Sequence, residues 1–387
     1  MKRERDIIDI DLFAGGGGLA VGLRLAGFAP ACFFEQDEQS CATLTTNAAA
    51  SGTLLGSVHK ENVREFDWCA VERRVRLLAA GAPCQPFSLA GKHLAYADGR
   101  NLFPEVTRAM RCLQPEAVLI ENVRGLARTA FAPYFEYILR CLECPSEEPR
   151  KNELWQNHNE RIRTRQRSPA YVPDYNVVWR VLDAADYGVP QNRVRVLIVA
   201  TRSDKAVYKF PNPTHSKIKL EQSQRNGSYW KKHSIRKRKN GVVIDEQTDP
   251  KEDEKLPWVT VREAIRDLPE PANCERKAMM NHWRIVGARP YPGHDGSALD
   301  WPSKTIKAGV HGVPGGENTL KAANGLIRYY TLRETARLQT FPDDHYFEGA
   351  RIHITRQIGN AVPCKLASII ATPLFELLND HNQITKK

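Results

Sequence analysis

The chain has 387 residues, of which 42% are hydrophobic and 26% charged, and its formal net charge is +11 at pH 7. That length allows a full hydrophobic core and predicts two unequal domains. The excess of positive charge favours a polyanionic partner such as a nucleic acid. No apolar run approaches the roughly 20 residues of a membrane span. Because few residues precede the first strand, we expect no signal peptide.

The 9 cysteines are scattered along the chain and odd in number, which argues against a disulfide framework. Reduced thiols are typical of a cytoplasmic protein, and we expect that location. Cys141-Leu142-Glu143-Cys144 is a single C-x-x-C without a second pair, so we interpret it as the end of a helix and expect no metal.

Strand-like and helix-like patterns alternate over about the first 200 residues. Strands are predicted at 7–12, 31–35, 75–80, 117–120, 177–182 and 194–200, and helices at 19–26, 102–113 and 134–141. Gly27 follows the first helix in the position of a C-cap. This alternation predicts an α/β fold with a mostly parallel sheet and helices on both faces.

The alternation stops near Thr201, and the chain up to about Tyr330 is rich in proline, glycine, asparagine and basic residues. Residues 146–168 are a smaller polar interruption, which we interpret as a surface loop. After Tyr330 the periodic patterns resume, and 365–378 predicts an amphipathic helix. We therefore expect one domain from residues 1–202 and 355–387 and a smaller domain, 203–354, inserted into it.

A glycine-rich turn follows the first strand and opens the first helix. It reads Gly15-x-Gly17-x-x-Ala20, and Glu35 ends the next strand about 20 residues further on. In this arrangement a carboxylate can hold the hydroxyls of an adenosine ribose. The pattern alone also fits a nicotinamide-dependent oxidoreductase, or a turn that only packs a helix onto a sheet.

Cys84 stands between two prolines in Gly81-Ala82-Pro83-Cys84-Gln85-Pro86-Phe87-Ser88, directly after the strand at 75–80. It is therefore expected at the carboxyl end of a strand, where open α/β sheets place their chemistry. Most cysteines of this kind are small buried hydrophobes, but proline restricts the backbone here and favours a nucleophile.

The octet around Cys84 resembles the catalytic loop of the DNA (cytosine-5) methyltransferases, and further motifs of that family occur in the family's order. They span Asp11–Gly18, Glu121–Val123, Gln191–Arg195, Arg333–Gln339 and Gln357–Pro363. The resemblance implies a Rossmann-like fold that binds S-adenosyl-L-methionine, with 203–354 as a target-recognition domain. It also implies an enzyme that methylates C5 of a flipped cytosine in a specific sequence of double-stranded DNA.

The resemblance also assigns roles to single residues. Cys84 would attack C6 of cytosine, and Glu121 would donate a hydrogen bond to N3. Arg193 and Arg195 are candidates to stabilise the thiolate, since alternation puts both on one face of their strand. Cofactor contacts are expected from Phe13, Ala14, Gly15, Gly17, Glu35, Asn62, Val63, Pro83, Leu102, Asn360 and Ala361. Most family members have an acid where Asn62 stands. The base that removes H5 is not identified.

Basic residues concentrate between Arg202 and Lys239, where only Asp204 and Glu221 oppose them. They are Arg202, Lys205, Lys209, Lys217, Lys219, Arg225, Lys231, Lys232, Arg236, Lys237, Arg238 and Lys239. Because Tyr229, Trp230 and His233 lie in this run, we interpret it as a nucleic-acid face rather than a solvated loop. Lys304–Lys307 and Pro314–Asn318 fit DNA-contact loops and structural turns equally well.

Three alternatives to a DNA methyltransferase stay open at this point. An RNA (tRNA) cytosine-5 methyltransferase would carry the same catalytic motifs, although the long basic insertion favours DNA. A nicotinamide oxidoreductase leaves Cys84 and Glu121 unexplained, and the presence of both argues against a catalytically silent DNA-binding relative. We expect a bacterial or phage restriction–modification enzyme that acts as a monomer away from membranes, with a cognate restriction endonuclease as a candidate partner.

Overall fold

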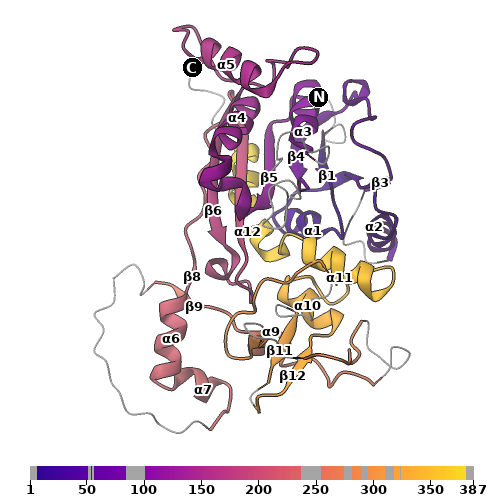
Figure 1. Cartoon of the computed structure of the whole chain (residues 1–387), viewed down its shortest axis with the longest axis vertical. Coiled ribbons are helices and arrows are strands. Elements are labelled where there is room, and N and C mark those ends of the chain that lie inside the picture. Colours follow the sequence, from indigo (N-terminus) through magenta and orange to yellow (C-terminus); the bar gives the residue numbers. More distant parts are fainter. Residues whose placement is uncertain are drawn as a thin grey trace. The chain divides into compact units, whose positions relative to one another are not determined.

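The computed structural model describes residues 7–50, 54, 56–83, 101–236, 254–273, 281–289, 295–309, 318–322 and 324–380. The chain divides into two compact units. Unit 1 comprises Met1–Leu182, Val194–Pro211 and Asp344–Lys387, and unit 2 comprises Asp183–Arg193 and Asn212–Asp343. Figure 1 traces both units in the colours of the sequence.

A 7-stranded sheet in the order β3-β2-β1-β4-β5-β7-β6 is the centre of unit 1. Its strands are β1 (Ile7–Leu12), β2 (Pro30–Phe34), β3 (Ser57–His59), β4 (Arg74–Ala80), β5 (Ala117–Val123), β6 (Tyr175–Asp183) and β7 (Val194–Arg202). The first five strands pair in parallel, and β7 runs antiparallel to β5. The predicted mostly parallel α/β sheet is therefore confirmed.

Helices cover both faces of this sheet. Successive side chains along its central strands point to opposite faces, and they are buried on both. Ile10, Leu78 and Ile120 share one core with helix residues, while Leu119 and Val199 on the other face are equally buried. The helices are α1 (Gly18–Leu25), α2 (Glu38–Ala50), α3 (Phe103–Leu113), α4 (Ala132–Glu143), α5 (Trp155–Gln166), α11 (Arg351–Asn360) and α12 (Cys364–Asn379). Short 3-10 turns lie at Trp68–Ala70 (η2), Arg124–Ala127 (η4) and Thr129–Phe131 (η5).

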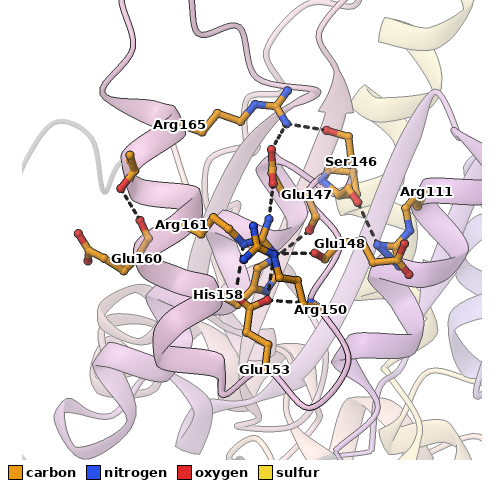
Figure 2. A network of polar contacts seen from close by, with 12 residues as sticks. Arg111, Ser146, Glu147, Glu148, Arg150, Glu153, His158, Glu160, Arg161 and Arg165 are labelled. Carbon is orange, nitrogen blue, oxygen red and sulfur yellow. Dashed lines mark hydrogen bonds and ion pairs between the residues drawn. The ribbon is translucent and has the colours of Figure 1, made fainter.

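The segment 146–168 contains the helix α5, so its interpretation as a surface loop was wrong. His158 and Ile162, one helical turn apart, are buried, and this narrow apolar stripe is easily missed in so polar a sequence. Figure 2 shows the contacts that fix the helix: Arg161 donates to Glu147 at 2.7 Å and to Glu153 at 3.0 Å. These carboxylates lie outside the helix, where a helical pattern cannot reveal them.

Unit 2 is built from short elements. The scarcity of long periodic segments in this part of the sequence predicts that. The elements are η6 (Ala184–Tyr187), β8 (His215–Ser216), α6 (Lys217–Arg225), α7 (Ser228–Lys232), β9 (Leu256–Pro257), α9 (Val261–Ile265), β10 (Ser297–Ala298), β11 (Thr319–Lys321), β12 (Ile327–Tyr329) and α10 (Leu332–Leu338). Capping boxes start α9 at Thr260 and α10 at Thr331, each with a glutamate at the third helical position.

The units differ from the predicted domains at three places. Residues Asp183–Arg193, predicted to lie in the first domain, belong to unit 2. Unit 1 continues to Pro211, because the Tyr208 hydroxyl donates to the carbonyl of Ile370 in α12 at 2.7 Å. It resumes at Asp344 rather than at residue 355, because Tyr346 is hydrogen-bonded to Asn47 in α2. The functional roles of the domains remain predictions.

Two findings differ from what the sequence led us to expect. Cys69 and Cys112 form a disulfide that joins η2 to α3, so the thiols are not all reduced. One helical stretch, Arg351–Asn379, is long and apolar enough to cross a membrane, although 56% of its apolar window is buried inside the structure. Core helices pass the same test, so this is weak evidence for a span. Cys144 caps the end of α4, as predicted.

Candidate functional site at the carboxyl edge of the sheet

Hydrogen bonds join the turns that follow β1 and β4 to the carboxyl ends of β1, β2 and β5. The amide of Ala14 donates to Phe34 at 3.2 Å, and the amide of Gly81 donates to Leu12 at 3.3 Å. The side chain of Asn122 donates to the carbonyl of Ala82 at 3.1 Å. The predicted cofactor loop and the base of the predicted catalytic loop therefore lie at one edge of the sheet.

The glycine loop, residues 13–18, carries unusual backbone angles. Phe13 has φ 58°, and Gly15 and Gly17 have φ 54° and 85°. A left-handed conformation is costly for a bulky residue such as phenylalanine, and such strain clusters at functional sites. A Cβ added at Gly15 would meet nothing closer than 4.0 Å. The loop thus leaves open space beside Gly15, and Phe13, two residues before it, is half-buried.

Glu35 is held in place by three backbone amides. Its Oε2 accepts from Gly15 at 2.8 Å, and its Oε1 accepts from Gln36 and Asp37 at 2.7 and 2.8 Å. A carboxylate offers about four lone-pair sites, so one or more remain for a ligand hydroxyl. The position of Glu35 fits its predicted contact with a ribose.

Asp11 is a candidate site residue to which the sequence analysis assigned no role of its own. Its carboxyl group is fully buried at the end of β1, and neither oxygen has a hydrogen-bond partner in the part of the chain that the structure describes. Burial, reinforced by the Glu35 carboxylate, raises the pKa of Asp11 well above its ordinary value. By contrast, the equally buried Asp9 is bonded to Arg76. The alternating acids of the strand were the available signal.

The remaining cofactor candidates are spread over several elements. Asn62 uses its side chain locally, donating to Glu65 and accepting from the amide of Arg64. Val63 is buried, Pro83 and Leu102 are half-buried, Ala361 is buried at the end of α11, and Asn360 is exposed there. Among the described residues, none of Asn62, Leu102 and Asn360 is hydrogen-bonded to the glycine loop.

Glu121 and Arg195 form an ion pair at the end of β5. Arg195 Nε lies 2.8 Å from Glu121 Oε1, and the two side chains are only 12% and 10% exposed. Charge-assisted hydrogen bonds in such surroundings are short and directional, so the carboxylate is held in one orientation. Cys84 itself lies outside the described residues. Asn122, next to Glu121, donates to the carbonyl of Ala82, which lies two residues before Cys84 in the sequence.

Arg193 occupies a different place from Arg195. Strand β7 begins at Val194, so the expectation that the two arginines share one face of a strand was wrong. Arg193 belongs to unit 2, is 1% exposed, and donates to the carbonyl of Ile306 at 3.1 Å. Within the same unit, Gln191 donates to Gln339 at 3.0 Å and accepts from the amide of Ile306. The motifs at 191–195 and 333–339 therefore stabilise each other.

Several residues that the structure describes in the unit 2 part of the basic run are paired or buried rather than solvated. Lys217 pairs with Glu221 and Lys232 with Glu263, while Lys237 to Lys239 lie outside the described residues. Tyr229 is buried, with its hydroxyl on Thr260, and the His233 side chain is 2% exposed. These two aromatic residues stabilise the unit, which corrects their interpretation as part of a nucleic-acid face.

The two candidate loops of unit 2 contact each other. The side chain of Asn318 accepts from the amide of Lys307 at 2.9 Å and donates to its carbonyl at 3.0 Å. This pair of bonds favours a structural role for these two residues. Residues 314–317 lie outside the described part of the chain.

Comparison with known proteins identifies relatives along almost the whole chain. Residues 7–144 and 170–376 match the C-5 cytosine-specific DNA methylase family. The chain is 31% identical to the Type II methyltransferase M.PspPI of Psychrobacter, over 96% of this chain and 79% of the relative. It is 32% identical to M.Eco47II of Escherichia coli, over 97% and 80%. It is 30% identical to M.NgoMIV of Neisseria gonorrhoeae, over 96% and 98%.

Solved structures share the fold at lower sequence identity. A substituted DNMT2 of Spodoptera frugiperda superimposes with a TM-score of 0.58 at 15% identity, covering 96% of this chain and 99% of that one. The Dnmt2 methyltransferase of S. pombe gives 0.56 at 18% identity, with coverages of 96% and 99%. Likeness at this level of identity supports the fold alone.

Proposed function

This chain belongs to the C-5 cytosine-specific DNA methylase family, and from that premise we propose that its catalytic groups are Cys84, Glu121 and Arg195. The family makes it an S-adenosylmethionine-dependent DNA (cytosine-5-)-methyltransferase. The single observation that best supports the assignment of residues is the polar contact between β5 and the base of the Cys84 loop. There Asn122 binds Ala82 while the adjacent Glu121 is oriented by Arg195.

The residues at the edge of the sheet fit S-adenosylmethionine. Gly15 borders open space, and the buried Asp11 carboxyl has no partner among the described residues. We propose that Phe13 stacks on the adenine and that Glu35 accepts hydrogen bonds from the ribose hydroxyls. When bound, the cofactor supplies a methyl group on a sulfonium. The other proposed contacts are Ala14, Gly17, Asn62, Val63, Pro83, Leu102, Asn360 and Ala361.

The target base must leave the DNA stack before the reaction, because C5 and C6 of cytosine are enclosed in a duplex. The Cys84 thiolate then adds to C6, and the electron pair of the C5–C6 bond becomes available at C5 for the methyl group. In its protonated form Glu121 donates a hydrogen bond to N3, where negative charge develops. Arg195 orients Glu121, while Arg193, the other predicted catalytic arginine, binds the carbonyl of Ile306 within unit 2. Loss of H5 and release of Cys84 complete the cycle.

We further propose that residues 203–354 recognise the DNA sequence, with basic side chains of the 202–239 run on the phosphates. The relatives are Type II methyltransferases, which supports a cytoplasmic role in a restriction–modification system, with a cognate endonuclease as partner. Monomeric action is the simplest expectation for an enzyme that methylates one flipped base at a time.

Bisulfite sequencing of DNA from a methylation-free host expressing the protein tests the function and reveals the target together. We expect cytosines in one short sequence to be fully protected, and none in a host expressing Cys84→Ser. Methylation of tRNA without methylation of duplex DNA would contradict the proposal and favour the RNA methyltransferase alternative.

A further inference from the structure

We propose that His345 is a positioning residue that fixes the glycine loop and thereby sets the affinity for S-adenosylmethionine. The inference rests on the proposed role of that loop in cofactor binding. His345 opens a four-residue segment, 345–348, which we call the C-terminal latch. The latch lies more than 300 positions from the loop in sequence, but in the same compact unit.

A hydrogen bond joins the latch to the loop. Nε2 of His345 lies 2.9 Å from the carbonyl oxygen of Gly16. A carbonyl only accepts, so the imidazole must carry its proton on Nε2 and donate. The His345 side chain is 0% exposed, so the bond is formed away from competing water. It fixes the direction of the Gly16 carbonyl, which lies between Gly15 and Gly17, the two glycines with left-handed backbone angles.

The latch is itself held from two helices. The side chain of Asn47 in α2 donates to the carbonyl of Tyr346 at 2.8 Å and accepts from its amide at 2.9 Å. Thr43 accepts from the amide of Glu348 at 2.8 Å, and Gln357 in α11 donates to the carbonyl of Glu348 at 2.9 Å. His345 therefore reaches the loop from an anchored backbone.

Side chains from the latch, from α2 and from α11 pack against Gly16 and Gly17. A Cβ added at Gly16 would lie 3.1 Å from Cβ of Gln357 and 3.4 Å from the Phe347 ring, and one added at Gly17 would lie 3.6 Å from the His345 ring. The His345 and Phe347 rings contact each other at 4.9 Å between centroids. The side of the loop next to Gly15 is open by comparison, and that is the side left for a ligand.

Glycine is the residue most in need of such an anchor. It loses more conformational freedom on ordering than any other residue, and ordering a loop at the moment of binding weakens the observed affinity. If His345 holds the Gly16 carbonyl before the cofactor binds, the conformational entropy of the loop is already lost on folding and does not weaken cofactor binding. Removing the donor should leave a loop that samples several conformations and binds the cofactor more weakly.

The test compares His345→Phe, which keeps a ring but loses the donor, with His345→Gln, whose amide nitrogen restores one. Calorimetry with S-adenosylmethionine should give a loss of affinity of roughly tenfold for the phenylalanine variant, as expected for one buried hydrogen bond. The glutamine variant should stay within about threefold of the wild type. Affinity for an unmethylated target duplex should be unchanged in both.

His282→Phe is the matched control, because His282 is a buried histidine of unit 2 with both ring nitrogens hydrogen-bonded. It should lower the melting temperature without changing cofactor affinity. Wild-type affinity in His345→Phe would overturn the proposal. If that variant does not fold, Asn47→Ala replaces it: it removes both bonds to Tyr346 and should also weaken cofactor binding, and unchanged affinity would overturn the proposal equally. Failure of the wild type to bind the cofactor would instead overturn the proposed function.

Discussion

The two units of this protein are stabilised in different ways. Unit 1 has an apolar sheet core in which residues such as Leu77, Leu119 and Val199 are buried. Unit 2 has short elements around buried polar side chains, among them Gln191, Arg193 and Arg333, which bind backbone carbonyls. Apolar burial is non-directional and tolerates small changes of shape, whereas buried polar groups require particular partners. Substitutions in the two units should therefore have effects of different size and kind.

The largest effect is expected in unit 1, where the chemistry is proposed. Glu121→Gln keeps the size of the side chain but removes the acid that Arg195 orients. Methyl transfer should slow by about 10²–10⁴, the usual contribution of a positioned proton donor, with little change in cofactor affinity. A tritiated-methyl assay and calorimetry measure the two quantities. A normal rate with lost cofactor binding would assign Glu121 to the cofactor site instead.

A pair of core substitutions compares the two kinds of stabilisation. Gln191→Leu in unit 2 orphans the Ile306 amide and the Leu338 carbonyl, each now bonded to the glutamine side chain. Each buried group left unpaired costs about 1–3 kcal/mol. Leu119→Met in unit 1 conserves volume and should cost less than about 1.5 kcal/mol. Denaturant unfolding measures both, and equal losses would show that the units do not differ in this way.

Cofactor binding should depend on a carboxylate that the fold already holds in place. Glu35→Ala removes the acceptor on three backbone amides of the loop region and the proposed partner of the ribose hydroxyls. We expect S-adenosylmethionine affinity to fall by roughly tenfold to a hundredfold, as for the loss of hydrogen bonds to a charged group. Unchanged affinity in the folded variant, measured by calorimetry, would refute this placement of the pocket.

A buried histidine should make the stability of unit 1 depend on pH. Burial is the main cause that lowers the pKa of His158 below its ordinary value of 6.5. The neutral ring accepts from Tyr137 and donates to the carbonyl of Glu147. Below pH 6.5 His158 is protonated in the unfolded chain but stays neutral in the folded chain, because its pKa is lower there. The free energy of unfolding that this residue contributes is therefore fully present above pH 6.5 and decreases as the pH falls. Melting curves between pH 5 and 8 should show this decline, and His158→Gln should flatten it.

The smallest effect concerns two adjacent lysines of α7 in unit 2. Lys232 pairs with Glu263 at 2.6 Å, whereas Lys231 is exposed and forms no ion pair among the described residues. Lys231→Ala should reduce the salt dependence of duplex binding by a slope of roughly 0.9 if it contacts a phosphate. Lys232→Ala should change it less. Both should affect target and non-target duplexes alike. A changed methylation sequence would mean that Lys231 reads bases.

Hydrophobic periodicity explains why most of unit 1 was predictable. The strands around Leu78, Ile120 and Val196 are apolar runs, and Cys84, Glu121 and Glu35 follow such runs directly. Partnerships between distant polar side chains were not predictable. Arg161 with Glu147, Gln191 with Gln339 and His345 with Gly16 leave no periodic trace, because each depends on where the backbone brings two segments together. The same reason hid α5, which is held by carboxylates outside the helix.

The nucleophile is the central claim, and Cys84→Ser tests it most directly. A hydroxyl is far less ionised than a thiol at neutral pH, so the account predicts no detectable methyl transfer by this variant in a tritiated-methyl assay. Binding of target duplex and of S-adenosylmethionine should stay at wild-type levels. Turnover close to that of the wild type would contradict the mechanism and remove Cys84 from the reaction.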